Sequence, residues 1–337
     1  MTNQPTTLRT AVNIVADACR VARAVQRNLE KVRKITKDDR SPVTVADFAV
    51  QAMVQLGLAL REDRPLIVGE ERAGALRDPE QRPVLDAVAE AVHAWREHIT
   101  TDEVLTAIDA CDHDGSGEAY WTLDPIDGTK GFLRGQQYAI ALARIEAGRV
   151  TLAVMGCPNL SIDQSASVAE ADAQGTLYIA TAGGGAWELP ANKPAAQPER
   201  VKVAQLGPTQ RIRACESVEA AHSKQSDTAR ILEELGGAGE PVRLDSQCKY
   251  AVVARGQADA YLRLPTKKDY VEKIWDHAAG MLIATEAGAV VTDVTGAELD
   301  FTQGRTLQAN RGIICAVPDI HPRIIDAIDR LGIAAAV

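Results

Sequence analysis

The stretch DPIDGT, at Asp124–Thr129, places two aspartates three positions apart directly after the apolar run Tyr120–Leu123. That run predicts the end of a buried β-strand, so both carboxylates are expected where the strand stops and the chain turns toward solvent. Two oxygen donors on a rigid turn can bind Mg²⁺, and the backbone N–H groups after Gly128 can face a phosphate oxygen. The same residues are also typical of an ordinary turn. The meaning of the stretch therefore depends on acidic residues elsewhere in the chain.

Three further acidic positions lie at the ends of predicted elements. Glu70 follows the short apolar run Leu66–Val68, and Asp276 heads a helical pattern. Asp47 lies early in another predicted helix, which Thr44 is expected to cap; an alternative interpretation leaves Asp47 as only a partner of this cap. If Glu70, Asp124, Asp127 and Asp276 converge, they form a carboxylate site for two magnesium ions. Such a site would activate water and neutralise phosphate oxygens.

Composition limits the class of protein. The chain has 337 residues, 46% of them apolar, and a net charge of −9, which argues against a surface for nucleic acid. Its six cysteines lack CxxC spacing, which favours free thiols in a reducing compartment. The first ten residues lack a secretory signal, and no apolar run approaches the length of a membrane span. We expect a cytoplasmic protein without a membrane segment.

Periodicity predicts an α/β fold. Helices are expected over residues 8–34, from 44 past Leu56, and over 83–95 and 102–110. Strands follow over residues 120–123, 138–146, 150–155 and 177–182, with a hairpin at Glu146–Arg149. Strands and helices alternate beyond the proline-rich stretch Pro190–Pro198. We take this stretch as a boundary between an N-terminal domain, residues 1–190, and a C-terminal domain, residues 191–337.

Other catalytic signatures are absent or misplaced. Aspartyl-phosphate phosphatases use a DxD motif before Gly-Thr, whereas two residues separate Asp124 from Asp127 here, which disfavours a covalent aspartate. The chain has no serine-nucleophile signature, Walker loop, dinucleotide fingerprint or HExxH motif. Direct attack by a metal-bound water is the better interpretation.

The three dispersed motifs, GEE at 69–71, DPIDGT at 124–129 and WDHAAG at 275–280, resemble the magnesium-dependent, lithium-sensitive phosphatases of the inositol monophosphatase superfamily. Within it the chain looks most similar to the 3'(2'),5'-bisphosphate nucleotidases. This closer likeness rests on Ser41–Thr44, Thr129–Phe132, Glu216–Ser223, Leu244–Tyr250 and Ala260–Pro265. The resemblance implies a layered sandwich in which helices alternate with mixed β-sheets, as in the inositol monophosphatase and fructose-1,6-bisphosphatase fold.

The resemblance also implies roles for single residues. Two or three Mg²⁺ ions would be held by Glu70, Asp124, the carbonyl of Ile126, Asp127 and Asp276. Asp47 and Thr129 fall where the family orients and deprotonates the attacking water, and the amides of Gly128 and Thr129 would face the scissile phosphate. The positions that contact the nucleotide in the family correspond to His222, Ser246, Lys249 and Arg263.

The implied activity is hydrolysis of the 3'-phosphate of adenosine 3',5'-bisphosphate to AMP. 3'-Phosphoadenylyl sulfate is a second expected substrate, which would place the enzyme in sulfur metabolism. One alternative is an inositol polyphosphate 1-phosphatase or inositol monophosphatase, and another is a catalytically silent nucleotide-binding sensor. We expect a monomer that binds a small molecule and no nucleic acid.

Overall fold

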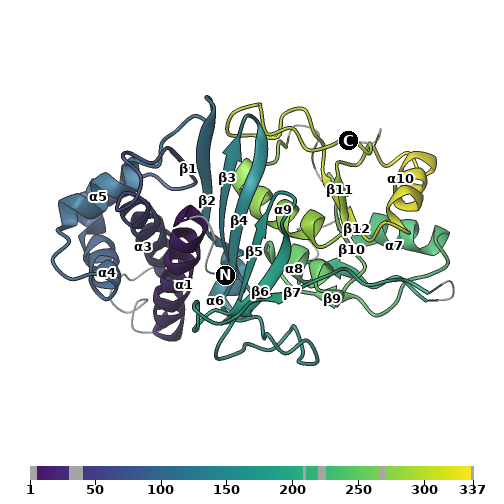
Figure 1. The fold of residues 1–337 in the computed structure, drawn as a ribbon, viewed down its shortest axis with the longest axis horizontal. Coiled ribbons are helices and arrows are strands. Elements are labelled where there is room, and N and C mark those ends of the chain that lie inside the picture. Colours follow the sequence, from purple (N-terminus) through teal and green to yellow (C-terminus); the bar gives the residue numbers. More distant parts are fainter. Residues whose placement is uncertain are drawn as a thin grey trace.

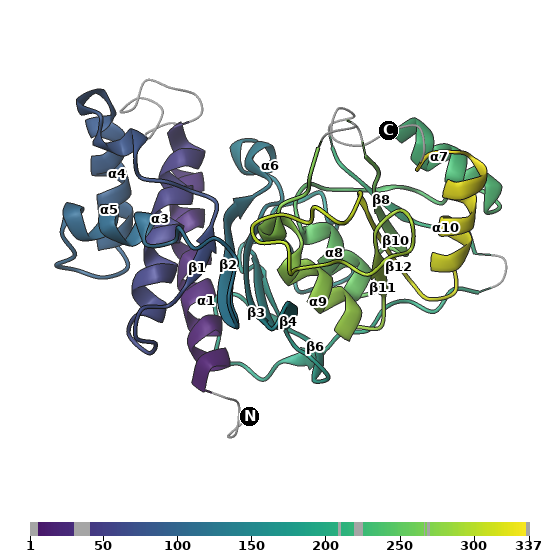
Figure 2. The ribbon, with the colours of Figure 1, turned by 90° about the horizontal axis from the view of Figure 1, so that it is seen from above.

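The computed structural model describes residues 6–29, 41–207, 210–218, 225–265, 267 and 270–334. Helices and sheets alternate in layers along the longest axis of the molecule (Figures 1 and 2). An N-terminal group of helices covers one face of a first sheet, two helices fill the space between this sheet and a second one, and two more helices cover the far face of the second sheet. This confirms the predicted layered α/β architecture.

The first layer is made of helices that share one apolar core with the first sheet. It contains α1 (Thr6–Arg27), α3 (Ser41–Leu58), α4 (Arg82–His93) and α5 (Thr101–Asp109), with the short 3₁₀ helices η1 (Ala75–Arg77) and η2 (Pro79–Gln81). Helices α1 and α3 pack against the sheet, and α4 and α5 pack on α3. One local prediction is wrong, because α3 begins at Ser41 and Thr44 therefore lies inside the helix instead of capping it. The end of α1 at Arg27 leaves residues 30–34 of the predicted helix outside the described residues.

The first sheet has seven strands in the described part of the chain, in sequence order, and only its edge pair β1–β2 is parallel. The predicted hairpin between β3 and β4 is confirmed, since Glu146 pairs with Arg149. The strands are β1 (Ile67–Gly69), β2 (Ala119–Asp127), β3 (Ala139–Glu146), β4 (Arg149–Cys157), β5 (Thr176–Thr181), β6 (Gly185–Pro190) and β7 (Glu199–Arg200). The short helix α6 (Thr129–Leu133) follows β2.

The remaining layers come from the second half of the chain. The five described strands of the second sheet lie in the order β11, β12, β10, β8, β9. Helices α8 and α9 lie between the sheets, and α9 is mostly buried, as expected for a helix with apolar residues on most sides. The elements are β8 (Ala214–Glu216), α7 (Gln225–Glu234), β9 (Val242–Arg243), α8 (Cys248–Ala254), β10 (Ala260–Arg263), η4 (Ile274–Asp276), α9 (Ala278–Glu286), β11 (Val290–Thr292), β12 (Ile313–Ala316) and α10 (His321–Arg330).

The proline-rich stretch does not end the first sheet, because β7 follows it and pairs with β6. The division into residues 1–190 and 191–337 stays a prediction about folding units. None of the described helices has both the length and the apolar character needed to cross a membrane.

Candidate active site

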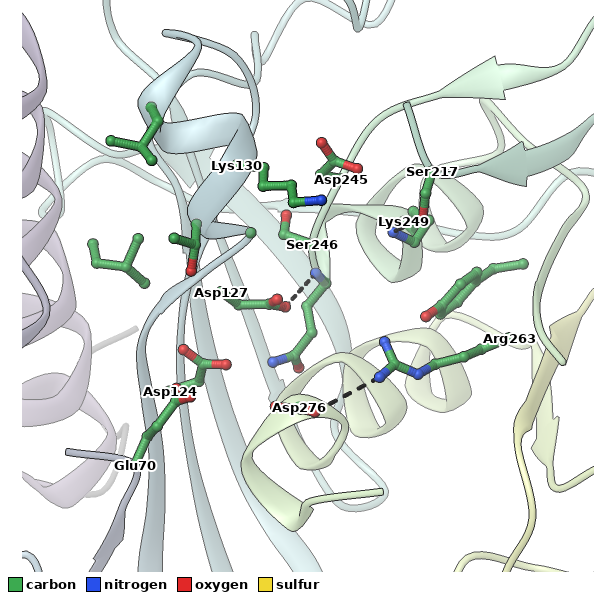
Figure 3. Close-up of a pocket in the computed structure, with 16 residues that line it drawn as sticks. Glu70, Asp124, Asp127, Lys130, Ser217, Asp245, Ser246, Lys249, Arg263 and Asp276 are labelled. Atoms are coloured by element: carbon green, nitrogen blue, oxygen red, sulfur yellow. Dashed lines mark hydrogen bonds and ion pairs between the residues drawn. The ribbon is translucent and has the colours of Figure 1, made fainter. Parts of the chain in front are cut away.

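A cavity of about 450 Å³ opens where the end of β2, the start of α6 and the segment before α8 meet (Figure 3). Glu70 and Asp124 lie on one side of it, and Lys249 and Arg263 on the other. Residues far apart in sequence thus face one space. The lining is Glu70, Asp124, Ile126, Asp127, Gly128, Thr129, Lys130, Leu133, Ser217, Asp245, Ser246, Gln247, Lys249, Tyr261, Arg263 and Asp276.

A β-bulge brings the two aspartates of DPIDGT to the same cavity. The predicted end of the strand at Leu123 is wrong, because β2 continues to Asp127. Asp124 pairs with Ala141 and Asp127 with Ala139, so two residues of β2 stand opposite one of β3. Side chains alternate between faces along a regular strand, and positions three apart would point to opposite sides. The extra residue, next to a proline that lacks an N–H, reverses this alternation and allows both carboxylates to face the cavity.

The carboxylate cluster carries more negative charge than the protein around it neutralises. Burial, followed by the charges of Glu70 and Asp127, raises the pKa of Asp124 well above its usual value, and Asp124 Oδ1 is buried without a hydrogen-bond partner. Glu70 is open to solvent at the edge of the cavity, yet withdrawal from bulk water and the charge of Glu71 raise its pKa to about 7. Burial and the charge of Asp127 likewise raise the pKa of Asp276.

These shifts share one physical cause, the crowding of acids in a space of low polarity. A bound cation would reverse them, because it stabilises the ionised carboxylates and supplies the partner that Asp124 Oδ1 lacks. The donor set consists of carboxylate oxygens, which suits a hard divalent ion. The site residues therefore fit a metal centre.

Gly128 is required where β2 passes into α6. Its φ of 91° and ψ of 46° lie in the left-handed region, and a Cβ built on it would come within 2.8 Å of Ser246 Cβ. Only glycine meets both demands at low cost. The result is that Thr129, the first residue of α6, lines the same cavity as Ser246.

Two buried glutamines, which the sequence analysis missed, hold the segments that carry the acids. Gln247 donates a hydrogen bond to the Trp275 carbonyl at 2.9 Å and accepts one from the Gly280 N–H at 3.0 Å, on either side of Asp276. Its own N–H donates to Asp127 Oδ2 at 2.5 Å. It therefore connects the two halves of the acidic cluster.

Gln51 holds the segment that carries Glu70 in place through its hydrogen bonds to the backbone. It donates to the Glu71 carbonyl at 2.9 Å and to the Ile108 carbonyl at 3.0 Å, and accepts from the Glu71 N–H at 3.0 Å. A glutamine inside an apolar helical run was the one sequence signal for this role.

The opposite wall of the cavity is cationic. Lys249 is only 5% exposed, and its Nζ lies 5.2 Å from the ring centroid of Tyr261 and 3.5 Å from Ser217 Oγ. Burial lowers the pKa of Lys249, while the charges of Asp127 and Asp245 oppose that shift. A buried ammonium group held this way can pair with an anionic ligand.

Arg263 is held beside Asp276 by a network behind the cavity. Its Nε donates to Glu272 Oε1 at 2.9 Å, and Glu272 Oε2 lies 3.1 Å from His277 Nε2. Tyr250 Oη lies 2.9 Å from His277 Nδ1 and completes the network. Burial acts to raise the pKa of Glu272, but the hydrogen bonds and charges of His277 and Arg263 outweigh it and hold that pKa at about 2. Ligand-type atoms of Glu272, Asp276 and His277 lie within 4.8 Å of one another, but both oxygens of Glu272 are already engaged.

The structure thus brings most of the sequence-predicted site residues to one cavity. Asp47 is the exception, since it does not line the cavity; it is buried behind it, where the charges of Glu71 and Glu70 add to burial in raising its pKa. Among the described residues, Asp47 and Thr129 share no hydrogen bond. His222 lies outside the described residues. Lining residues that the sequence analysis missed are Lys130, Leu133, Ser217, Asp245, Gln247 and Tyr261.

Acids that fit a metal, facing a lysine and an arginine across one cavity, define a metal-dependent enzyme that acts on a phosphate-bearing substrate. The chain belongs to the inositol monophosphatase family, whose model matches residues 3–332. This family is metal-dependent.

Known proteins resemble the chain over most of its length. A 3'(2'),5'-bisphosphate nucleotidase of Schizosaccharomyces pombe is 42% identical over 304 residues, which cover 87% of this chain and 85% of that protein. A 3'(2'),5'-bisphosphate nucleotidase of Emericella nidulans is 39% identical over 325 residues, with 88% and 90% covered. Among solved structures, Mycobacterium tuberculosis SuhB superposes with a TM-score of 0.61 over 98% of this chain and 99% of that one, and at 21% identity it supports the fold alone.

Proposed function

We propose that this protein hydrolyses the 3'-phosphate of adenosine 3',5'-bisphosphate, giving AMP and inorganic phosphate, and that it also accepts 3'-phosphoadenylyl sulfate. The observation that carries the proposal is the pairing of two charged regions in one cavity. The acids at the end of β2 fit a metal centre for the scissile phosphate, while Lys249 and Arg263 on the opposite wall can neutralise a second phosphate. The names of the relatives in S. pombe and E. nidulans support the same substrate class.

Magnesium is the proposed cofactor, bound as two or three ions by Glu70, Asp124, the carbonyl of Ile126, Asp127 and Asp276. Bound there, Mg²⁺ would withdraw charge from the phosphate oxygens and lower the pKa of a nearby water. The choice of magnesium rests on the all-oxygen donor set, because neither thiolate nor imidazole lines the cavity in the described part of the chain.

The residues of the chain itself then position the reactants and move a proton. We assign Thr129, which lines the cavity, and Asp47 to the removal of a proton from the attacking water, as the family resemblance implies; a threonine hydroxyl can pass such a proton on to a carboxylate. The water attacks phosphorus directly and the bond to the 3'-oxygen breaks. Ser246, Lys249, Arg263 and His222 are assigned to the nucleotide, and the amides of Gly128 and Thr129 to the scissile phosphate.

Two alternatives can be distinguished by one experiment. Phosphate release with Mg²⁺ should be measured for adenosine 3',5'-bisphosphate, inositol 1-phosphate and inositol 1,4-bisphosphate. The proposal requires the highest kcat/KM for the nucleotide. Faster cleavage of an inositol phosphate would identify an inositol phosphatase instead, and tight calorimetric binding of the nucleotide without phosphate release would identify a sensor. A monomeric state, a cytoplasmic location and inhibition by lithium stay predictions.

A further inference from the structure

A second group of cationic side chains lies on α1, away from the active site. Arg20, Arg23 and Arg27 are spaced so that one face of the helix presents all three. All three line a cavity of about 380 Å³, and Arg23 and Arg27 also line a neighbouring cavity of about 350 Å³, which shares Ala173 with the first. Neither cavity shares a lining residue with the active-site cavity.

Arg23 is a buried cation without an anionic partner. Its side chain is 9% exposed, and burial lowers its pKa. Nη1 donates to the Ala173 carbonyl, whereas Nη2 is inaccessible to solvent and has no hydrogen-bond partner. The carboxylate whose charge acts on the Arg23 guanidinium is that of Asp172. Its Oδ1 already accepts hydrogen bonds from the Gln174 and Gly175 N–H groups, at 2.7 Å each. A buried guanidinium left in this state is costly, and it adds positive charge to the wall of both cavities.

The neighbouring arginines also leave positive charge available. Arg27 is exposed and makes no ion pair among the described residues. Arg20 pairs with Asp17 at 3.4 Å, but both side chains are about half exposed, and such a pair is weak. Three guanidinium groups therefore face two carboxylates, those of Asp17 and Asp172, in a protein whose net charge is −9.

We propose that these two cavities form a binding site for a phosphate group, either as inorganic phosphate or as the head of a small phosphomonoester. Guanidinium groups match the geometry of phosphate oxygens and form charge-assisted hydrogen bonds with them. The amides of Gln174 and Asn192 in one cavity provide neutral polar contacts for the rest of such a ligand. The amides of Gln26 and Asn159 in the other cavity bond to each other and to backbone carbonyls.

The two arginine-lined cavities, here called the arginine site, are connected to the active site through α6 but share no lining residue with it. Gln26, next to Arg27, donates a hydrogen bond to the Phe132 carbonyl of α6 at 2.9 Å and accepts one from Asn159 Nδ2 at 3.0 Å. Helix α6 starts at Thr129, in the active-site cavity, and Gly135 beyond its end lines the smaller arginine cavity. The two sites thus lie at opposite ends of one short segment.

Calorimetry on metal-free protein in phosphate-free buffer with EDTA tests the proposal. Inorganic phosphate and ribose 5-phosphate are titrated into the wild type, Arg27→Gln, Arg20→Gln and the control Arg9→Gln, which removes an exposed arginine of α1 that lines neither cavity. We expect Arg27→Gln to weaken binding by about tenfold or more, because a charge-assisted hydrogen bond is lost. Because Arg27 is exposed, its replacement should leave the fold intact.

Lys249→Ala provides the second control, since it removes a cation of the active-site cavity and should leave this binding unchanged. Tighter binding of ribose 5-phosphate than of phosphate supports a phosphomonoester ligand, and equal binding supports inorganic phosphate. The proposal is overturned if neither probe binds, if Arg27→Gln and Arg20→Gln both bind like Arg9→Gln, or if Lys249→Ala alone abolishes binding.

Discussion

Replacing Gln247 with leucine tests how the acidic cluster is held together. Leucine has a similar volume but cannot make the hydrogen bonds of the amide to the Trp275 carbonyl and the Gly280 N–H, at 2.9 and 3.0 Å. Gln247 is only 2% exposed, so water cannot replace these bonds. Leaving a buried polar group unpaired costs about 1 to 3 kcal/mol, and two such groups give a loss of about 2 to 6 kcal/mol in the free energy of unfolding.

The assay is urea unfolding of metal-free protein followed by circular dichroism, with Gln303→Leu as the control. Gln303 is exposed and bonds only to its neighbours Asp300 and Thr302, so its replacement should cost less than about 0.5 kcal/mol. Because Gln247 fixes the backbone around Asp276, its loss should also weaken magnesium binding by about tenfold. Equal unfolding free energies for both variants would refute this account of the site.

Three further predictions concern charge. Asp127→Asn should keep the fold but abolish metal-dependent phosphate release, and near-normal release would remove Asp127 from the metal site. Lys249→Ala should raise KM for the bisphosphate by about tenfold or more with a smaller change in kcat, because it removes a charged contact to the phosphate that is not cleaved; an unchanged KM would contradict that role. The metal-free protein should be less stable at pH 8 than at pH 5, as urea midpoints in EDTA can show. The pKa values of Asp124 and Glu70 are raised in the folded state, the latter to about 7. The folded protein therefore retains protons that the unfolded chain releases from about pH 4 upward, and stability falls across that window. Added Mg²⁺ should restore stability at pH 8, and greater metal-free stability at pH 8 would be evidence against the cluster.

The alternation of helices and strands and the acidic positions of the cluster could be predicted from local pattern, whereas the layered arrangement was implied by the resemblance of the three motifs to a known family. Apolar periodicity gave the order of helices and strands, and acids at the ends of apolar runs indicated Glu70, Asp124, Asp127 and Asp276. The continuation of β2 through Asp127 could not be predicted, because proline and glycine favour a turn locally and only pairing with β3 keeps the strand extended.

The burial of Lys249 and the residues that hold the acidic segments in place also could not be predicted from the sequence. Lysines are seldom buried, so nothing in the local pattern around Lys249 indicated a side chain only 5% exposed. Gln51 and Gln247 act through backbone groups that are close in space but distant along the chain. Contacts of this kind depend on tertiary packing, which periodicity does not encode.

The central claim is that this cavity removes the 3'-phosphate from a nucleotide that keeps its 5'-phosphate. The most direct measurement is identification of the nucleoside product by chromatography after incubation of the wild type with adenosine 3',5'-bisphosphate and Mg²⁺. The account predicts adenosine 5'-monophosphate and one equivalent of phosphate, with neither formed in EDTA. Adenosine 3'-monophosphate as the product, or no turnover at all, would contradict it.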